Sequence, residues 1–228
     1  MFLAIAAVSG CAGVETASTP AMKGRLQARP GNVHTSPRPS APWLYVPKTV
    51  KEPAPLLIAL HGAGGRGART LEYTRGSADG IGAIVIAPDS LGRTWDVIAS
   101  DLGPDVARID AQLAAVFGAF AIDVGRIAVS GFSDGASYAL TLGIANGDLF
   151  SHAIAYSPGF LAAPAATGSP RIFISHGTRD GILPIDRCSR RLAPGLKRAG
   201  YDVEYVEFDG GHTVPAGIAR AAMEWFTE

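Results

Sequence analysis

The length, composition and charge of the chain fit a single folded domain. It has 228 residues, of which 47% are hydrophobic and 18% charged, enough apolar surface for a large core and too much for a disordered chain. Twenty basic and twenty acidic side chains cancel, so nothing indicates nucleic acid or an anionic surface as a partner. The two cysteines, Cys11 and Cys188, show no metal-ligand spacing, and no metal or cofactor is expected.

Residues 1–42 differ in texture from the rest. An apolar run from Phe2 to Val8 ends in Ser9-Gly10-Cys11, which resembles the signal of bacterial lipoproteins, in which the cysteine is acylated. No Lys or Arg precedes the run, and it is too short to span a bilayer. Glu15 to about Pro42 is rich in Pro, Gly, Ser, Thr and Ala, which predicts a flexible linker. We expect an exported chain with membrane attachment only through Cys11, or a cytoplasmic one if this segment is not a signal.

From residue 43 to residue 228, short apolar runs alternate with stretches of helical periodicity. The runs are Trp43–Val46, Leu56–Leu60, Ala83–Ala87, Arg126–Ser130, His152–Tyr156, Arg171–Ser175 and Val203–Phe208. Several are apolar at nearly every position, as in strands buried on both faces. Apolar residues step by three and four between Val106 and Phe120 and again between Ile218 and Phe226. We predict one α/β domain with a doubly wound, mostly parallel sheet and helices on both faces.

Two connecting segments bear on access to the expected site. Ala68–Gly82 reads as a modest loop, and Ser157–Pro170 is a short segment rich in Pro, Ala and Gly. Neither offers room for a helical lid, so we expect no large cap domain. The site should then be shallow and open to water.

A motif for an activated serine follows the fourth of these runs. Strand Arg126–Ser130 leads into Gly131-Phe132-Ser133-Asp134-Gly135 and then into a helical stretch. A strand-to-helix turn sharp enough to expose a serine hydroxyl strains the serine and leaves room only for glycine on either side. The order of strand, glycines and helix therefore predicts that Ser133 is a nucleophile.

A nucleophilic serine needs a base, and the base needs an acid to orient it. Asp180 follows the run Arg171–Ser175, and His212 follows Val203–Phe208. Strand ends meet at one edge of an open parallel sheet, so these groups can converge on Ser133. Asp186, where a helix is expected to begin, reads as a cap or surface residue. Asp209 lies too close to His212 in sequence to orient its ring easily.

Taken together, residues 43–228 resemble the α/β-hydrolase family, and are most similar to its small carboxylesterases, including the phospholipase/carboxylesterase and secreted polyester or feruloyl esterase groups. The resemblance places Asp180 and His212 in the acid and histidine positions of that family. His176 and His61 are similar to histidines with structural roles. His34 and His152 fall in the linker and at a strand start.

The resemblance also implies an oxyanion hole. The segment His61-Gly62-Ala63-Gly64-Gly65 is similar to the HGxGG-type loop of the family, in which the third residue supplies a backbone N–H. Asp134, which follows the nucleophile, supplies the other. In similar esterases an aromatic residue at the position of Trp95 lines the acyl or alcohol pocket, and packing at the domain surface is an equally good alternative here.

Three functions compete at this stage. The favoured one is a carboxylic ester hydrolase that works through a seryl-acyl intermediate on small-molecule or polymeric esters. A serine peptidase or amidase with the same triad is the second, but no peptide-binding domain is visible. A non-catalytic binding module is the third, disfavoured because every expected catalytic position is filled. The related dienelactone hydrolases carry cysteine as the nucleophile in this strand-to-helix turn, where this chain has Ser133.

Overall fold

A seven-stranded sheet forms the centre of the molecule. The structure, a computed structural model, describes residues 24–30, 41, 43–99, 103–162 and 165–228. The strands are β1 (Leu44–Tyr45), β2 (Ala54–Leu60), β3 (Ile84–Ile86), β4 (Ile122–Phe132), β5 (His152–Tyr156), β6 (Arg171–Gly177) and β7 (Val203–Phe208). They lie in the order β1-β3-β2-β4-β5-β6-β7, with β1 antiparallel to β3 and the other neighbours parallel. The predicted doubly wound, mostly parallel sheet is confirmed.

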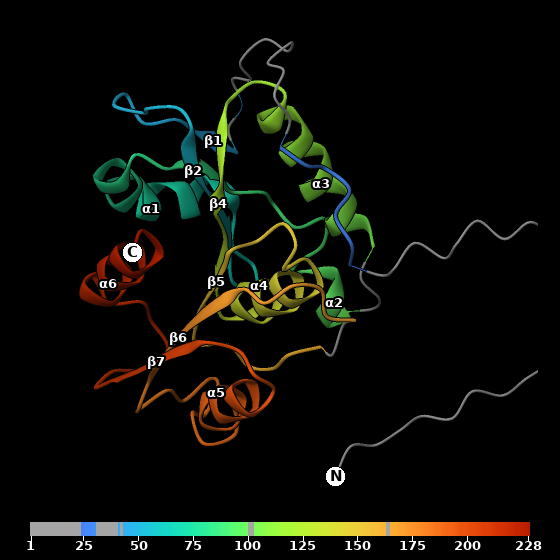
Figure 1. The fold of residues 1–228 in the computed structure, drawn as a ribbon. Helices are drawn as coiled ribbons and strands as arrows, with labels where there is room; N and C mark the ends of the chain where they lie inside the picture. Colours follow the sequence, from blue (N-terminus) through green and yellow to red (C-terminus); the bar gives the residue numbers. More distant parts are fainter. Residues whose placement is uncertain (1–23, 31–40, 42, 100–102, 163–164) are drawn as a thin grey trace, which may run out of the picture.

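Helices cover both faces of the sheet, as predicted (Figure 1). The helices α1 (Gly67–Ile81) and α6 (Ala216–Phe226) lie on one face. The other face carries α3 (Pro104–Phe117), α4 (Asp134–Ala145) and α5 (Ser189–Arg198), with the short α2 (Asp96–Ala99) beside them.

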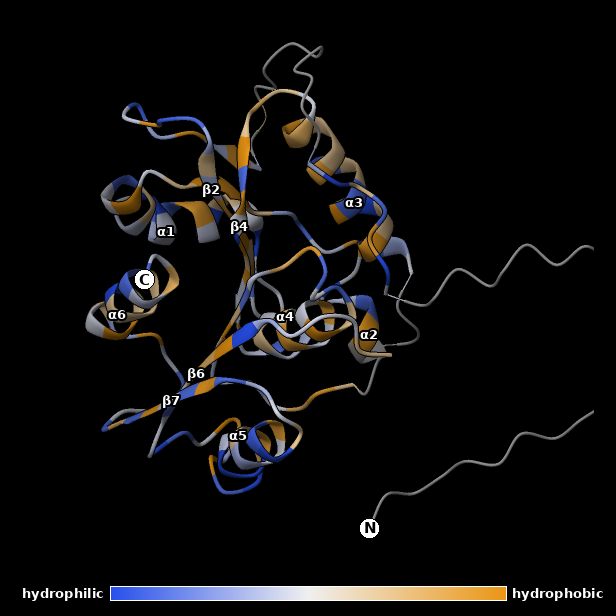
Figure 2. Cartoon of the chain, viewed as in Figure 1, coloured by the Kyte–Doolittle hydropathy of each residue, from blue (hydrophilic) through white to orange (hydrophobic). Residues whose placement is uncertain are grey.

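Side-chain alternation along the strands produces two cores. In β2, where every residue is buried, Leu56, Ile58 and Leu60 pack into the core under α3 and α4. Leu57 and Ala59 point the other way, into the core under α1 and α6. Figure 2 shows the apolar central strands enclosed between these helix layers. The continuous apolar runs therefore reflect burial on both faces.

The prediction of a loop over Ala68–Gly82 is wrong, because α1 occupies this segment. The helix has low mean hydropathy and contains Gly76 and Gly80, which are poor helix formers. Its buried side chains include Leu71 and Ala78, seven residues apart, so the apolar stripe is too sparse to reveal the helix.

The prediction of a flexible linker is wrong for residues 24–30, which pack against the domain. Leu26 is only 1% exposed, and its backbone N–H donates to Oδ1 of Asn146 at 2.8 Å. The Arg25 guanidinium donates to both carboxylate oxygens of Asp148, each at 2.7 Å. The packed part of the chain therefore begins before residue 43, because one buried leucine and one paired arginine tie down a segment of otherwise linker-like composition.

The predicted lipoprotein signal around Cys11 lies outside the described residues and stays a prediction. Within the part of the chain that the structure describes, no helix is both long and apolar enough to cross a membrane.

The described residues between Ser157 and Pro170 form no helix. As far as the structure describes it, the connection between β5 and β6 thus supplies no helical cap.

Candidate active site

The turn between β4 and α4 is built around Ser133. The serine has φ 58° and ψ −120°, a strained backbone conformation for a residue with a side chain. A Cβ atom on Gly131 would collide with the carbonyl oxygen of Gly135, and one on Gly135 would collide with that of Leu60. Only glycine allows the strand, the helix and β2 to approach this closely, and the resulting turn lifts the serine side chain off the end of the sheet.

Three side chains from three strand ends meet at this turn. His212, after β7, has Nε2 at 2.8 Å from Oγ of Ser133 and Nδ1 at 2.6 Å from Oδ2 of Asp180, which follows β6. The carboxylate can only accept, so Nδ1 carries the proton and Nε2 presents its lone pair to the serine hydroxyl. The Phe132 ring lies 4.7 Å from the imidazole and packs against it. This arrangement can remove a proton from Ser133 and store it on a paired imidazole.

Asp180 is held in a buried network. Burial opposes its ionisation most strongly, yet hydrogen bonds from the Leu183 N–H, His212 and the Ile182 N–H together lower its pKa. The aspartate is 6% exposed. It therefore remains an acceptor for His212 over the neutral pH range.

His176 also contacts the carboxylate of Asp180. It is fully buried, and burial lowers its pKa, so the ring is neutral. Its Nε2 lies 2.8 Å from the carbonyl oxygen of Leu183 and 3.2 Å from Oδ2 of Asp180, while Nδ1 lies 2.7 Å from Oγ of Ser189. An Nε2–H donor and an Nδ1 acceptor satisfy all of these contacts. The location agrees with the structural role that the sequence suggested.

The alternative acids lie at the surface. Asp186 is 77% exposed and pairs with Arg190 at 2.8 Å, and Asp209 pairs with Arg179. Asp180 is the carboxylate that contacts His212.

The loop after β2 lies against the serine. A Cβ atom placed on Gly62 would be 3.3 Å from Cβ of Ser133. In this loop the Gly64 N–H donates to the carbonyl oxygen of Arg93 at 2.8 Å. Among the described residues, the N–H groups of Ala63 and Asp134 donate to no backbone acceptor. Both predicted oxyanion donors are thus available, and Asp134 adds the positive end of the α4 dipole.

Trp95 does not line the pocket, contrary to the prediction, and it packs in the interior rather than at the domain surface. The indole is fully buried, stacks on Tyr138 with ring centroids 5.1 Å apart, and donates from Nε1 to the carbonyl oxygen of His61 at 2.8 Å. His61 in turn accepts from the Ser90 N–H at 3.0 Å and has Nδ1 at 2.8 Å from the carbonyl oxygen of Gly62. Trp95 is enclosed because it lies beneath the loop of His61, where it fixes the path of that loop.

Comparison with known proteins gives a consistent result. No protein-family model matches the chain. In sequence it is similar to "Probable feruloyl esterase C" of Aspergillus terreus, with 30% identity over 177 residues that cover 64% of each protein. The chain therefore spans somewhat less than two thirds of that relative.

The solved structures most relevant to the fold are also esterases or related hydrolases. Esterase PE8 has a TM-score of 0.63 at 22% identity, covering 81% of this chain and 96% of that one. A phospholipase/carboxylesterase from Dyadobacter fermentans has a TM-score of 0.63 at 21% identity, with the same coverage of 81% and 96%. An S-formylglutathione hydrolase from Staphylococcus aureus has a TM-score of 0.65 at 15% identity, covering 81% and 91%. The chain has the α/β-hydrolase fold. It is similar in sequence to a probable feruloyl esterase and in fold to esterases.

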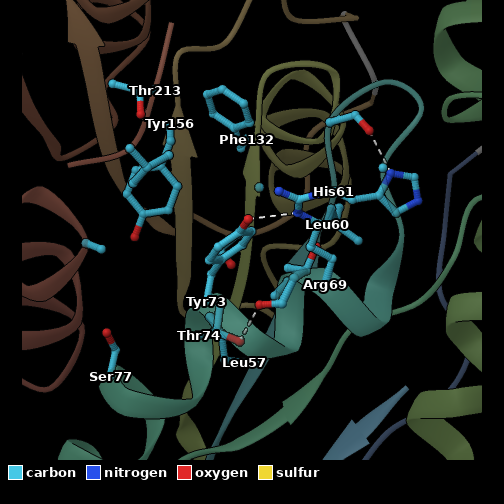
Figure 3. Close-up of a pocket in the computed structure, with 18 of the residues that line it drawn as sticks. Leu57, Leu60, His61, Arg69, Tyr73, Thr74, Ser77, Phe132, Tyr156 and Thr213 are labelled. Carbon is cyan, nitrogen blue, oxygen red and sulfur yellow. Dashed lines mark hydrogen bonds between the residues drawn. The ribbon is translucent and has the colours of Figure 1, made fainter. Parts of the chain in front are cut away.

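In this α/β-hydrolase fold a cavity of about 650 Å³ borders His212. Figure 3 shows several of the side chains that line it. Its walls come from β2, β4 and β5 on the sheet and from α1 and α6, and they include His212 and Ala63. The prediction of a shallow site therefore left out this cavity. The segment read as a loop is α1, and small side chains such as Ala59 and Ala219 leave a gap between this helix, α6 and the sheet.

Sequence reasoning missed the residues that hold the loops in place. Thr94 donates from Oγ1 to Oδ2 of Asp134 at 2.7 Å, and Trp95 and Ser90 hold His61. The His-Gly pair that opens the loop after β2 was the available signal for a fixed histidine.

Across the described residues, no three His, Cys, Asp or Glu side chains are grouped to hold a metal ion.

Proposed function

We propose that the chain hydrolyses carboxylic esters, with Ser133 as nucleophile, His212 as general base and acid, and Asp180 as the residue that positions the imidazole. One observation carries the proposal. The unbroken hydrogen-bond line from Asp180 through His212 to Ser133 lies beside the backbone N–H groups of Ala63 and Asp134, which donate to no backbone acceptor in the described part of the chain.

In the acylation step, Nε2 of His212 takes the hydroxyl proton while Oγ of Ser133 forms a bond to the ester carbonyl carbon. The carbonyl oxygen becomes an alkoxide, which accepts hydrogen bonds from the Ala63 and Asp134 N–H groups. The C–O bond to the alcohol then breaks, and His212 gives its proton to the departing oxygen. Asp180 stays ionised and stabilises the imidazolium.

Deacylation repeats these roles with water. His212 removes a proton from a water molecule, whose oxygen attacks the acyl carbon on Ser133. The second alkoxide uses the same two N–H donors, and its collapse returns the proton to Oγ and releases the carboxylic acid. The absence of a helical cap between β5 and β6 among the described residues suits small and polymeric esters alike.

The comparisons support an ester rather than an amide substrate, because the sequence relative and two of the structural neighbours cited above carry esterase names. We place the catalytic domain at residues 43–228, joined by the packed segment 24–30. Export, with anchoring through Cys11, is proposed on the sequence of residues 1–23 alone.

The proposal is tested by measuring kcat/KM for p-nitrophenyl acetate, a feruloyl ester and a peptide p-nitroanilide. Wild type should hydrolyse the esters and leave the anilide intact, and Ser133→Ala should lose ester turnover while its circular dichroism is unchanged. Ser169→Ala, the same substitution at an exposed serine, is the matched control and should behave as wild type. Ester turnover that survives in Ser133→Ala, or cleavage of the anilide alone, would overturn the proposal.

A further inference from the structure

The cavity beside the triad is built from small side chains at its floor and wall. Ala59 of β2 and Ser130 of β4 lie on the sheet, and Ala219 lies on α6. Larger residues at these positions would fill the space between α1 and α6, as they do elsewhere in this core. At about 650 Å³ the cavity has the volume of a small-molecule site.

A buried phenol without a partner points into this cavity. Tyr156, at the end of β5, is 9% exposed, and Figure 3 shows its ring projecting into the pocket from the sheet. Its backbone oxygen accepts from the Ser133 N–H at 2.9 Å, which fixes the residue relative to the nucleophile. Within the described structure the Tyr156 hydroxyl forms no hydrogen bond with any protein group. The residue lines the cavity, so its hydroxyl is accessible from that space, and a ligand oxygen bound there can form a hydrogen bond with it.

The tyrosine can act as a donor. Burial raises the pKa of Tyr156, so the phenol keeps its proton over the whole range in which an imidazole base works. The hydroxyl can therefore donate to a ligand oxygen, or accept from a ligand hydroxyl.

The rim of the cavity sets its charge preference. Among the described residues that line it, the charged ones are Arg66 and Arg69, both basic, and Arg66 also pairs with Asp89 at 3.8 Å. Arg69 donates from Nε to the hydroxyl of Tyr73 at 2.8 Å, and this tyrosine is 68% exposed (Figure 3). Arg69 leaves the rim basic, which disfavours a cationic ligand, and the aromatic and aliphatic walls favour an apolar one.

The position of His212 decides which half of an ester lies here. His212 protonates the departing oxygen, so the alcohol part of the substrate lies against the imidazole. The cavity borders this ring and also the Ala63 loop that receives the carbonyl oxygen. We propose that the cavity binds the alcohol part of the substrate, and that it selects large, mainly apolar alcohols that carry no positive charge and have an oxygen function at the far end, which hydrogen-bonds to Tyr156. This inference rests on the proposed ester hydrolysis.

Three acetate esters test the inference: ethyl acetate, 2-naphthylmethyl acetate and (6-hydroxy-2-naphthyl)methyl acetate. All form the same acetyl-enzyme, so differences in kcat/KM report binding of the alcohol and acylation. The methylene group insulates the departing oxygen from the ring substituent. Wild type should prefer the hydroxylated ester to the unsubstituted naphthylmethyl ester by about five- to tenfold, the value of one hydrogen bond.

Two substitutions should remove the selectivity separately. Tyr156→Phe should bring the ratio between the two naphthylmethyl esters close to one, whereas Tyr205→Phe, which removes a phenol bonded to Glu207 on β7, should leave the ratio as in wild type. Ala219→Phe should lower the preference for 2-naphthylmethyl acetate over ethyl acetate by about tenfold, because the ring occupies the cavity. Ala221→Phe, at an exposed position of the same helix, is its control.

The result that overturns the inference is hydrolysis of all three esters with both ratios unchanged in Tyr156→Phe and Ala219→Phe. If no ester is hydrolysed, the proposed function fails and the cavity is tested by itself. Calorimetry with (6-hydroxy-2-naphthyl)methanol should then show binding to wild type that weakens about fivefold in Tyr156→Phe. Equal affinity for the two proteins, or no binding to wild type, would end the assignment of the cavity.

Discussion

Replacing Asp180 by asparagine should disable the site without unfolding it. Oδ1 of Asp180 accepts two backbone hydrogen bonds, from Ile182 at 2.9 Å and Leu183 at 2.8 Å, and an asparagine oxygen can keep both. Its amide NH₂ then occupies the place of Oδ2, 2.6 Å from Nδ1 of His212. Two donors cannot face each other at this distance, so the imidazole must carry its proton on Nε2.

The magnitude follows from the position of that proton. An Nε2–H group faces Oγ of Ser133, 2.8 Å away, and cannot accept the hydroxyl proton. A wrong tautomer of this kind lowers kcat by about 10⁴-fold in a serine protease, equivalent to about 5 kcal/mol in the barrier, and we expect a similar loss here. The assay is kcat/KM for p-nitrophenyl acetate, together with the rate of labelling by a fluorophosphonate.

Asp186→Asn is the matched control, since this exposed carboxylate lies six residues further along the same chain segment and pairs with Arg190. It should keep its turnover. The reasoning is refuted if Asp180→Asn, with an unchanged melting temperature, stays within tenfold of wild type. A loss in Asp186→Asn as large as that in Asp180→Asn would refute it equally.

Three further predictions concern packing, pH and the loop after β2. Gly131→Ala should cost about 3 kcal/mol or prevent folding, because its Cβ meets backbone, whereas Gly76→Ala in α1 meets nothing and should stabilise by about 0.5–1 kcal/mol in urea titrations. Burial lowers the pKa of His152 from 6.5 to about 4, so the unfolded chain binds its proton more tightly between these values. The free energy of unfolding should thus fall by about 3 kcal/mol as pH drops through that window, and urea titrations of His152→Gln should lack this fall. Trp95→Phe removes the donor to the carbonyl oxygen of His61 and should lower kcat about tenfold with little change in KM; an unchanged kcat would argue against its positioning role.

Much of the architecture was predictable because burial on both faces leaves a strong mark on sequence. Each predicted strand overlaps an observed one, and His152–Tyr156 and Val203–Phe208 match their observed bounds. The strand-to-helix turn at Ser133 was predictable because the close approach of the backbone admits only glycine at residues 131 and 135. The rule that parallel strands end at one edge put Asp180 and His212 among the candidates, and the resemblance to the α/β-hydrolase family selected them.

What escaped prediction depends on contacts between distant segments. α1 packs through few apolar side chains and contains Gly76, so its pattern resembled that of a loop. The orientation of Trp95 depends on His61 and Tyr138, which are neighbours only in the folded chain. The cavity also exists only where α1 meets α6, whose residues are more than a hundred positions apart.

The central claim is that an acyl group is carried on one particular hydroxyl. Rapid acid quenching of the protein during turnover of p-nitrophenyl acetate, followed by peptide mass spectrometry, tests this directly. We predict a single acetyl group, carried on Ser133. Acetylation at another side chain, or steady hydrolysis with no acetyl group on Ser133 at any quench time, would contradict the account.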